Sequence, residues 1–221
     1  GKGKDETAYA IVKYHHGMLY LMDCGGFLDG FGEPTLQALA GRALRWGVNR
    51  VLVEENFGGG MFGQLLKPWL AKVRPDEDLL RENPHLKDAR VGTVDDEWKG
   101  WSSGMKEMRI LDTLEPILAN HKLVVNRQLL EEDLKVQTET PAYSLVYQMT
   151  RLARVKGCLP HDDRVDALAM ACSYFVEKMD RDQQRAVEAA KAAKLDEELR
   201  RYAKHVFGGS TKRYKLYART R

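Results

Sequence analysis

The stretch Glu33–Glu54, EPTLQALAGRALRWGVNRVLVE, decides the fold because it joins an amphipathic pattern to a short apolar run. From Glu33 to Trp46 the apolar residues recur at spacings of three and four, which predicts a helix with one buried face. Gly47 follows, where a glycine commonly ends a helix. Asn49–Glu54 (NRVLVE) is rich in aliphatic and β-branched residues and predicts a buried parallel strand.

The segments on either side extend this unit into an α/β domain. Upstream, Thr7–Lys13 and Gly17–Asp23 are apolar runs separated by a short turn and predict a β-hairpin. Downstream, Met61–Val73 predicts a second helix. The order strand–strand–helix–strand–helix indicates an α/β fold with a mixed central sheet flanked by helices.

The rest of the chain contains three clearer elements and two ambiguous ones. Lys106–Asn120 predicts a helix, residues 121–126 a short strand, and a helix that starts at residue 161 or 162 reaches about residue 178. Residues 74–104 predict a loop, a short strand and an excursion, whereas 143–151 fits either a strand or a helical turn.

Composition excludes several classes of protein. With 43% hydrophobic and 30% charged residues over 221 positions, the chain is globular rather than collagen-like or disordered. It has no apolar run long enough for a membrane span and no hydrophobic signal-peptide core at its start, so we expect no membrane partner. Its three cysteines lie far apart, which argues against a zinc ribbon or disulfide scaffold and fits a reducing cytoplasm.

Charge divides the chain unevenly. Residues 178–221 contain 13 Lys and Arg against 6 Asp and Glu, whereas the whole chain has a formal charge of only +3. Residues 179–221 are therefore interpreted as a basic C-terminal tail that could meet phosphates or an acidic partner. On charge alone, a solvated helix end is the favoured interpretation.

The first candidate site residue is Glu54, the last residue of the strand VLVE. The carboxyl ends of buried strands are where α/β proteins bind ligands, and a carboxylate there needs a cation or a partner. A salt bridge or a helix N-cap explains Glu54 equally well.

The second candidate group is HDDRVDALA, in which Asp162, Asp163 and Asp166 open a helix. Helix capping is the default role of such acids, but three acids in five positions repel one another unless a divalent cation neutralises them. Asp5, in a glycine-rich turn, is the third candidate, with turn formation as its alternative role. Oxygen ligands of this kind favour Mg²⁺ or Mn²⁺ over Zn²⁺. Because Lys4 is followed by Asp5, the loop is not a Walker A motif, and we expect no ATP site.

Five segments together resemble the nuclease domain of the large terminase subunit of tailed bacteriophages, closest to the DNA maturase B type of short-tailed phages. In chain order they are GKGKDETAYAIVKY, VLVEENFGGGMFGQLL, GMKEMRILDTLEP, HKLVV and PHDDRVDALAMA. The resemblance covers most of residues 1–178. It implies an RNase H-like nuclease domain there, which cuts concatemeric viral DNA during genome packaging with two divalent metals, Mg²⁺ or Mn²⁺.

The resemblance also implies roles for single residues. Glu54 matches the family's strand-end glutamate, Asp163 the aspartate that starts the final helix, and Asp5 the aspartate that closes the glycine loop, with Asp162 as a possible second ligand. Lys106 and Arg109 correspond to a region near the DNA, although a solvated helix face is the favoured interpretation from the residues alone.

Two parts of the family pattern precede this chain's first residue. They are a strand with the first metal-binding aspartate and the ATPase motor, so we expect the chain to be a fragment or part of a longer polypeptide. The implied partners are double-stranded DNA, the terminase ATPase domain, the small terminase subunit and the portal or procapsid. The isolated domain is expected to be monomeric and to act in the host cell cytoplasm.

Two alternatives share the fold. In one, the chain is a non-catalytic DNA-binding or assembly module whose acids serve as helix caps. In the other, it is a resolvase-type nuclease that cuts four-way junctions.

Overall fold

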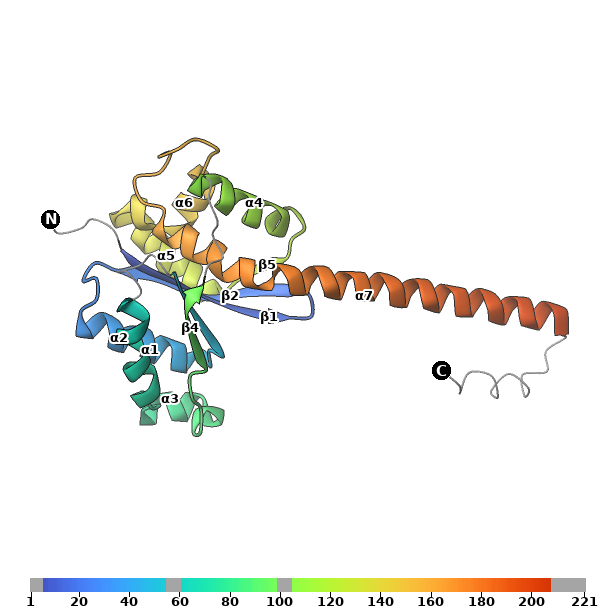
Figure 1. The fold of residues 1–221 in the computed structure, drawn as a ribbon, viewed down its shortest axis with the longest axis horizontal. Helices are drawn as coiled ribbons and strands as arrows, with labels where there is room; N and C mark the ends of the chain where they lie inside the picture. The colour runs from blue at the N-terminus through green and yellow to red at the C-terminus, as the bar shows by residue number, and fades with distance from the viewer. Residues whose placement is uncertain (1–5, 55–60, 99–104, 208–221) are drawn as a thin grey trace. The chain divides into compact units, whose positions relative to one another are not determined.

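The structure is a computed structural model that describes residues 6–54, 61–98 and 105–207. The chain divides into two units, Gly1–Val176 and Glu177–Arg221. Elements are labelled in Figure 1. No helix in the described ranges is both long and apolar enough to cross a membrane. The cysteines Cys24, Cys158 and Cys172 are all free thiols.

The first sheet is mixed, as predicted, and has the order β1-β2-β5. β1 (Thr7–His15) and β2 (Met18–Phe27) pair antiparallel through a two-residue turn in which His16 and Gly17 have φ of 47° and 76°. Positive φ at both positions matches the twist of a tight hairpin. β5 (Leu123–Val125) joins β2 in parallel. The predicted hairpin and the predicted strand at residues 121–126 are thus confirmed.

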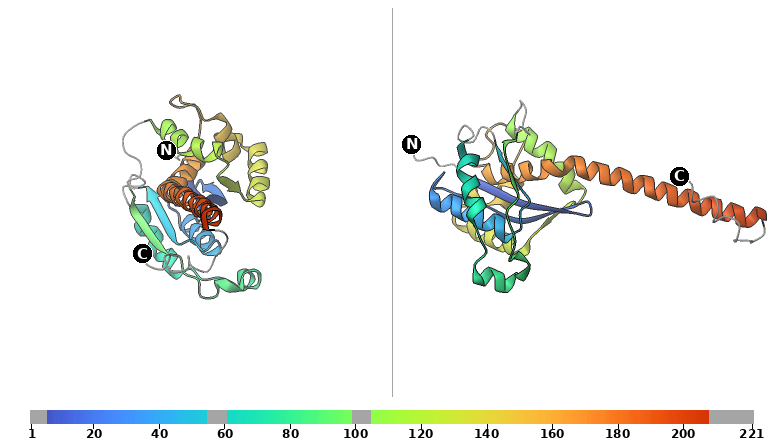
Figure 2. Two further views of the ribbon diagram at one scale, coloured as in Figure 1. Left: turned by 90° about the vertical axis from the view of Figure 1, so that its right-hand side faces the viewer. Right: turned by 60° about the horizontal axis from the view of Figure 1, so that its bottom comes forward.

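A second, parallel sheet consists of β3 (Arg50–Glu54) and β4 (Thr93–Trp98). The helices α1 (Glu33–Arg45) and α2 (Met61–Lys72) pack against it. The buried residues of the shared core are Leu36, Ala40, Ala43, Val53, Phe62, Leu66 and Leu70. Figures 1 and 2 show α1 and α2 on the side of the β1–β2 hairpin opposite α4 (Lys106–Ala119). The predicted helices and the parallel strand are confirmed, but Val53 is the one residue of β3 in the buried class.

The first ambiguous stretch contains two short helices and the predicted short strand, and its end, residues 99–104, lies outside the described residues. Residues 74–98 form α3 (Glu77–Glu82), the 3₁₀ helix η2 (Pro84–Leu86) and β4. Residues 143–151 resolve into the end of η3 (Pro141–Tyr143) and α6 (Leu145–Arg151), a helix rather than a strand. α5 (Arg127–Glu139) had not been predicted from the sequence.

The last helix, α7, runs from Asp163 to Phe207. In the first unit its inner face is fully buried, with Val165, Leu168, Ala169 and Cys172 each 0% exposed. In the second unit its apolar side chains are exposed, among them Leu195, Leu199 and Tyr202. The predicted helix over residues 161–178 is confirmed, and it continues beyond the predicted end.

Candidate functional site

Glu54 lies at the C-terminal end of β3, as predicted. Its side chain is half-buried, and its backbone lies opposite Trp98 of β4. Since β3 and β4 are parallel, their carboxyl ends share one edge of the sheet, the edge at which α/β folds commonly bind ligands. Residues 55–60, including the turn considered as a helix N-cap for Glu54, lie outside the described residues.

The start of α7 meets the start of β1. The backbone amide of Glu6 donates a long hydrogen bond of 3.4 Å to Oδ2 of Asp163, although the two residues are 157 positions apart. Asp5 lies outside the described residues, but it directly precedes Glu6 in the chain. The fold therefore brings the segment that follows the glycine-rich turn to the first acid of α7.

Asp162 and Asp166 have a different neighbour. The Lys106 ammonium of α4 lies 2.9 Å from Oδ1 of Asp162 and 3.0 Å from Oδ2 of Asp166. The crowding predicts a divalent cation, which stays a prediction; in the structure a protein ammonium lies beside this pair, and its single charge offsets one of the two carboxylates. Asp162 and Asp163 are thus held by different elements although they are adjacent in sequence.

Partial burial shifts the pKa values of Lys106 and Asp166. Burial acts to lower the pKa of the Lys106 ammonium, but Asp166 and Asp162 outweigh it and leave that pKa raised. Burial also raises the pKa of Asp166, although Lys106 and, more weakly, Arg109 pull it down. Lys106 and Arg109 therefore act on the acids at the start of α7, while their contact with DNA stays a prediction.

Replacing Lys106 with methionine is expected to lower the free energy of unfolding by about 1–2 kcal/mol, because it leaves two half-buried carboxylates without their shared donor. For a domain of this size the melting temperature should fall by about 3–6 °C. Thermal unfolding of Lys106→Met beside Lys135→Met, which removes an exposed lysine of α5, measures the difference. Equal melting temperatures for the two variants would show that the ion pairs contribute nothing.

A buried ion pair next to these acids had not been predicted from the sequence. The Arg164 guanidinium donates from Nε and Nη2 to the two carboxylate oxygens of Glu6, each at 2.8 Å. Both residues are only 8% exposed. Nη1 of Arg164 also lies 3.8 Å from Oδ1 of Asp133. The sequence signal was slight: each member of the pair directly follows a predicted site aspartate.

Asp133 in turn organises the helix before α7. Its carboxylate accepts hydrogen bonds from the Ser144 hydroxyl at 2.7 Å and from the backbone amides of Leu145 and Val146 at 2.8 and 3.0 Å. These amides open α6, so a side chain of α5 caps the N-terminus of α6. Through its contact with Arg164, Asp133 also links the start of α6 to the start of α7.

Among the residues that the structure describes, no group of three or more His, Cys, Asp or Glu side chains is arranged to hold a metal ion. Glu54, Asp162 and Asp163 do not form such a group by themselves, and Asp5 lies outside the described residues. The expected convergence of Glu54 and Asp163 on one metal site stays a prediction.

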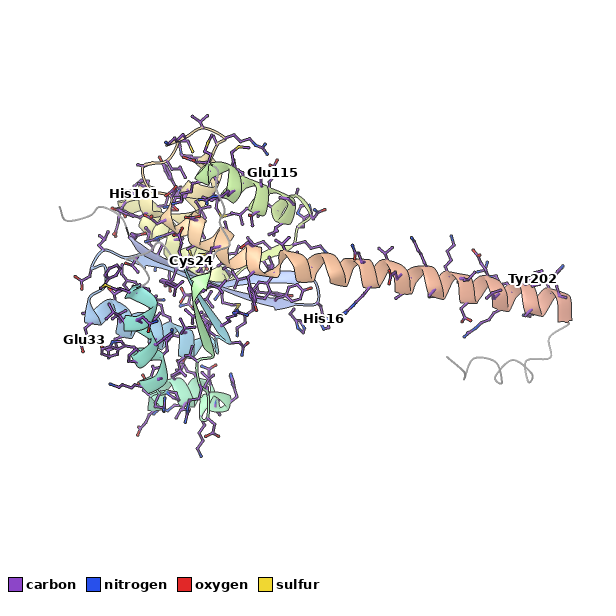
Figure 3. All side chains as sticks on the ribbon, in the orientation of Figure 1. His16, Cys24, Glu33, Glu115, His161 and Tyr202 are labelled. Atoms are coloured by element: carbon purple, nitrogen blue, oxygen red, sulfur yellow. The ribbon has the colours of Figure 1, made fainter. Side chains whose placement is uncertain are left out.

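His161, labelled in Figure 3, stacks on Tyr143 with ring centroids 4.4 Å apart.

The fold belongs to a known family of viral terminase domains. Residues 1–123 match the family described as "Terminase Bacteriophage T7, Ribonuclease H-like domain", which is more than half of the chain, and the chain belongs to that family. The predicted RNase H-like fold and the terminase resemblance are thereby confirmed.

One relative in particular is the large subunit of the terminase of Enterobacteria phage T3. It is 38% identical over 204 residues, which are 90% of this chain and 32% of that protein. This chain therefore spans about a third of the relative's length. Among solved structures, the Mn-soaked, inhibitor-bound human cytomegalovirus terminase nuclease domain aligns with a TM-score of 0.44 at 16% identity, over 77% of this chain and 76% of that chain.

Proposed function

We propose that this chain is the nuclease domain of a terminase large subunit, a divalent-metal-dependent endodeoxyribonuclease that cuts concatemeric viral DNA during genome packaging. Family membership supports a terminase role. The observation that favours the nuclease most is the meeting of Asp163, at the start of α7, with Glu6, the residue that directly follows Asp5. This hydrogen bond brings the backbone at the start of β1 to the carboxylate of Asp163, 157 positions away in the chain.

The donor chemistry fits Mg²⁺ or Mn²⁺, because the candidate ligands are all carboxylates. Glu54 and Asp163 would hold two such ions, with Asp162 or Asp5 completing the set. Bound in pairs, these cations activate a water and stabilise the leaving oxygen in phosphodiester hydrolysis. We propose Asp163, which matches the family's aspartate at the start of the final helix, as the principal ligand, and Asp162, whose carboxylate pairs with the Lys106 ammonium at 2.9 Å, as a possible second one.

The remaining assignments follow from the proposed role. Double-stranded DNA is the substrate, and Lys106 and Arg109 are proposed to contact its phosphates once the substrate is bound. The ATPase domain of the terminase, the small terminase subunit and the portal or procapsid are the proposed partners, in the host cell cytoplasm. We also propose a nuclease domain over residues 1–178, monomeric in isolation, and a basic tail over 179–221.

One observation favours a second candidate, a non-catalytic DNA-binding or assembly module on the same fold. Lys106 pairs with both Asp162 and Asp166 through one ammonium, as expected if these acids have a structural role. In this alternative Glu54 and Asp163 would not act on a common ion.

A plasmid-nicking assay separates the two. The 221-residue chain and the natural polypeptide that carries it are each incubated with supercoiled plasmid in Mn²⁺, in Mg²⁺ and in EDTA. We expect nicked and linear DNA with the natural polypeptide in either metal and intact plasmid in EDTA. Plasmid that stays intact in Mn²⁺ would overturn the nuclease proposal, and a strong preference for four-way junctions over plasmid would indicate a resolvase-type nuclease instead.

A further inference from the structure

The ion pair between Glu6 and Arg164 occupies a special place relative to the candidate ligands. Glu6 directly follows Asp5, and Arg164 directly follows Asp163. The pair therefore joins the two backbone segments that carry these aspartates, 158 positions apart, through two hydrogen bonds of 2.8 Å. The Glu6 amide adds a third link, to the carboxylate of Asp163 itself.

The two hydrogen bonds fix the relative orientation of the Glu6 and Arg164 side chains as well as the distance between them. A guanidinium is planar and rigid, so two parallel hydrogen bonds to one carboxylate leave little freedom of rotation between the partners. A lysine at position 164 would keep the charge but lose this fork. Nη1 of Arg164 also lies 3.8 Å from the carboxylate of Asp133, the residue that caps α6, so a second acid helps to hold the guanidinium in place.

The sheet is shaped to accept the Glu6 side chain. Gly26 lies on β2, and a Cβ added there would come within 2.5 Å of the Glu6 carboxyl carbon. Glycine within a strand usually weakens it, and one common reason for its presence is the close approach of another group. A larger residue at position 26 would push the Glu6 carboxylate away from Arg164.

Stability alone is a poor explanation for such a pair. Removing two charges from water costs free energy that their attraction often fails to recover, and apolar replacements are frequently as stable. Cys24, labelled near the centre of the unit in Figure 3, is buried and places its Sγ 4.0 Å from the carbonyl oxygen of Arg164, so this backbone lies in the interior. A role in geometry accounts better for a fully paired, bidentate arrangement in this position.

We propose that Glu6 and Arg164 are a positioning pair, which holds Asp163 against the segment leading into β1 and so sets the spacing of the carboxylates at the metal site. The inference rests on the nuclease function proposed above. Neither residue touches metal or DNA in this scheme. Their effect is transmitted to Asp163 through the backbone of Arg164 and the amide of Glu6.

The test uses Arg164→Lys and Gly26→Ala in the natural polypeptide, with Arg154→Lys as the matched control. Arg154 is an exposed arginine that pairs with Glu115 at 2.9 Å, away from the pair. Outer-shell partners of metal ligands typically contribute about 10–100-fold to metal affinity. We expect both test variants to need at least about 10-fold more Mn²⁺ for half-maximal cleavage, while Arg154→Lys behaves as the wild type.

A second measurement does not depend on metal. The backbone amide of Glu6 donates a hydrogen bond to Asp163. Its hydrogen exchange should become at least about 10-fold faster in Arg164→Lys, while amides in the middle of α7 keep their protection. Unchanged Mn²⁺ dependence in a folded Arg164→Lys, or unchanged exchange at Glu6, would overturn the positioning role. If the wild type itself neither binds Mn²⁺ nor cleaves, the nuclease proposal fails, and the exchange experiment still decides whether the pair positions Asp163.

Discussion

Replacing Glu54 with alanine, or Asp163 with asparagine, should lower the rate of plasmid cleavage at saturating Mn²⁺ by at least about 10³-fold. Each change removes a proposed metal ligand, and a bound cation contributes several kcal/mol to stabilising the charge that develops during hydrolysis. Asparagine at position 163 keeps the size of the side chain and its acceptor for the Glu6 amide, so the effect should fall on the metal rather than on the fold.

The matched control is Asp78→Ala, which removes an exposed acid of α3 that pairs with Arg81. Its cleavage rate should equal that of the wild type. Mn²⁺ binding measured by calorimetry should weaken in both site variants and remain unchanged in the control. Cleavage that survives both the Glu54 and the Asp163 substitution would show that the metal site has been assigned to the wrong residues.

The elements that the sequence predicted well are those in which local pattern and tertiary burial agree. In α1 the apolar residues recur with helical spacing, and Leu36, Ala40 and Leu44 are indeed the buried ones. In β3 the aliphatic run correctly predicted a parallel strand that ends at Glu54. Both patterns are local, so one short window of sequence contains the information needed.

α5 was missed because its burial depends on distant groups. Its sequence, RQLLEEDLKVQTE, has few apolar residues, and one of its two buried side chains is the charged Asp133. A carboxylate is buried there because it caps α6 and faces Arg164. Those partners lie 12 and 31 positions away, which no periodicity in the helix itself could reveal.

The candidate site was predicted only in part, because several of its contacts also depend on residues that are distant in the chain. The acid cluster at 162–166 was recognised from its crowding, whereas the divalent cation inferred from that crowding stays a prediction. That the Lys106 ammonium lies beside Asp162 and Asp166 depends on how α4 packs beside α7, which is a tertiary property. The Glu6–Arg164 pair is more remote still, since it joins the two ends of the domain.

Replacing Asp133 with alanine should have the largest effect on stability, a loss of about 3–5 kcal/mol in the free energy of unfolding. The Asp133 carboxylate is 5% exposed and accepts three hydrogen bonds of 2.7–3.0 Å. Its removal leaves the Ser144 hydroxyl and two amides of α6 buried without that acceptor, at about 1–3 kcal/mol for each group that water cannot reach. It also takes away the Asp133 carboxylate that lies 3.8 Å from Arg164, but Arg164 keeps its two hydrogen bonds to Glu6, so this contact adds little to the loss.

Urea unfolding followed by circular dichroism measures this loss, with Glu131→Ala, an exposed acid of the same helix, as the control. Asp133→Asn should fall between the two, because its single carbonyl oxygen can still accept from the α6 amides while its charge is gone. A loss below about 1 kcal/mol in Asp133→Ala would mean that water replaces the carboxylate at little cost. In that case the start of α7 would have to be held by Glu6 and Arg164 alone, and Arg164→Lys should then be the more damaging substitution for folding as well as for metal binding.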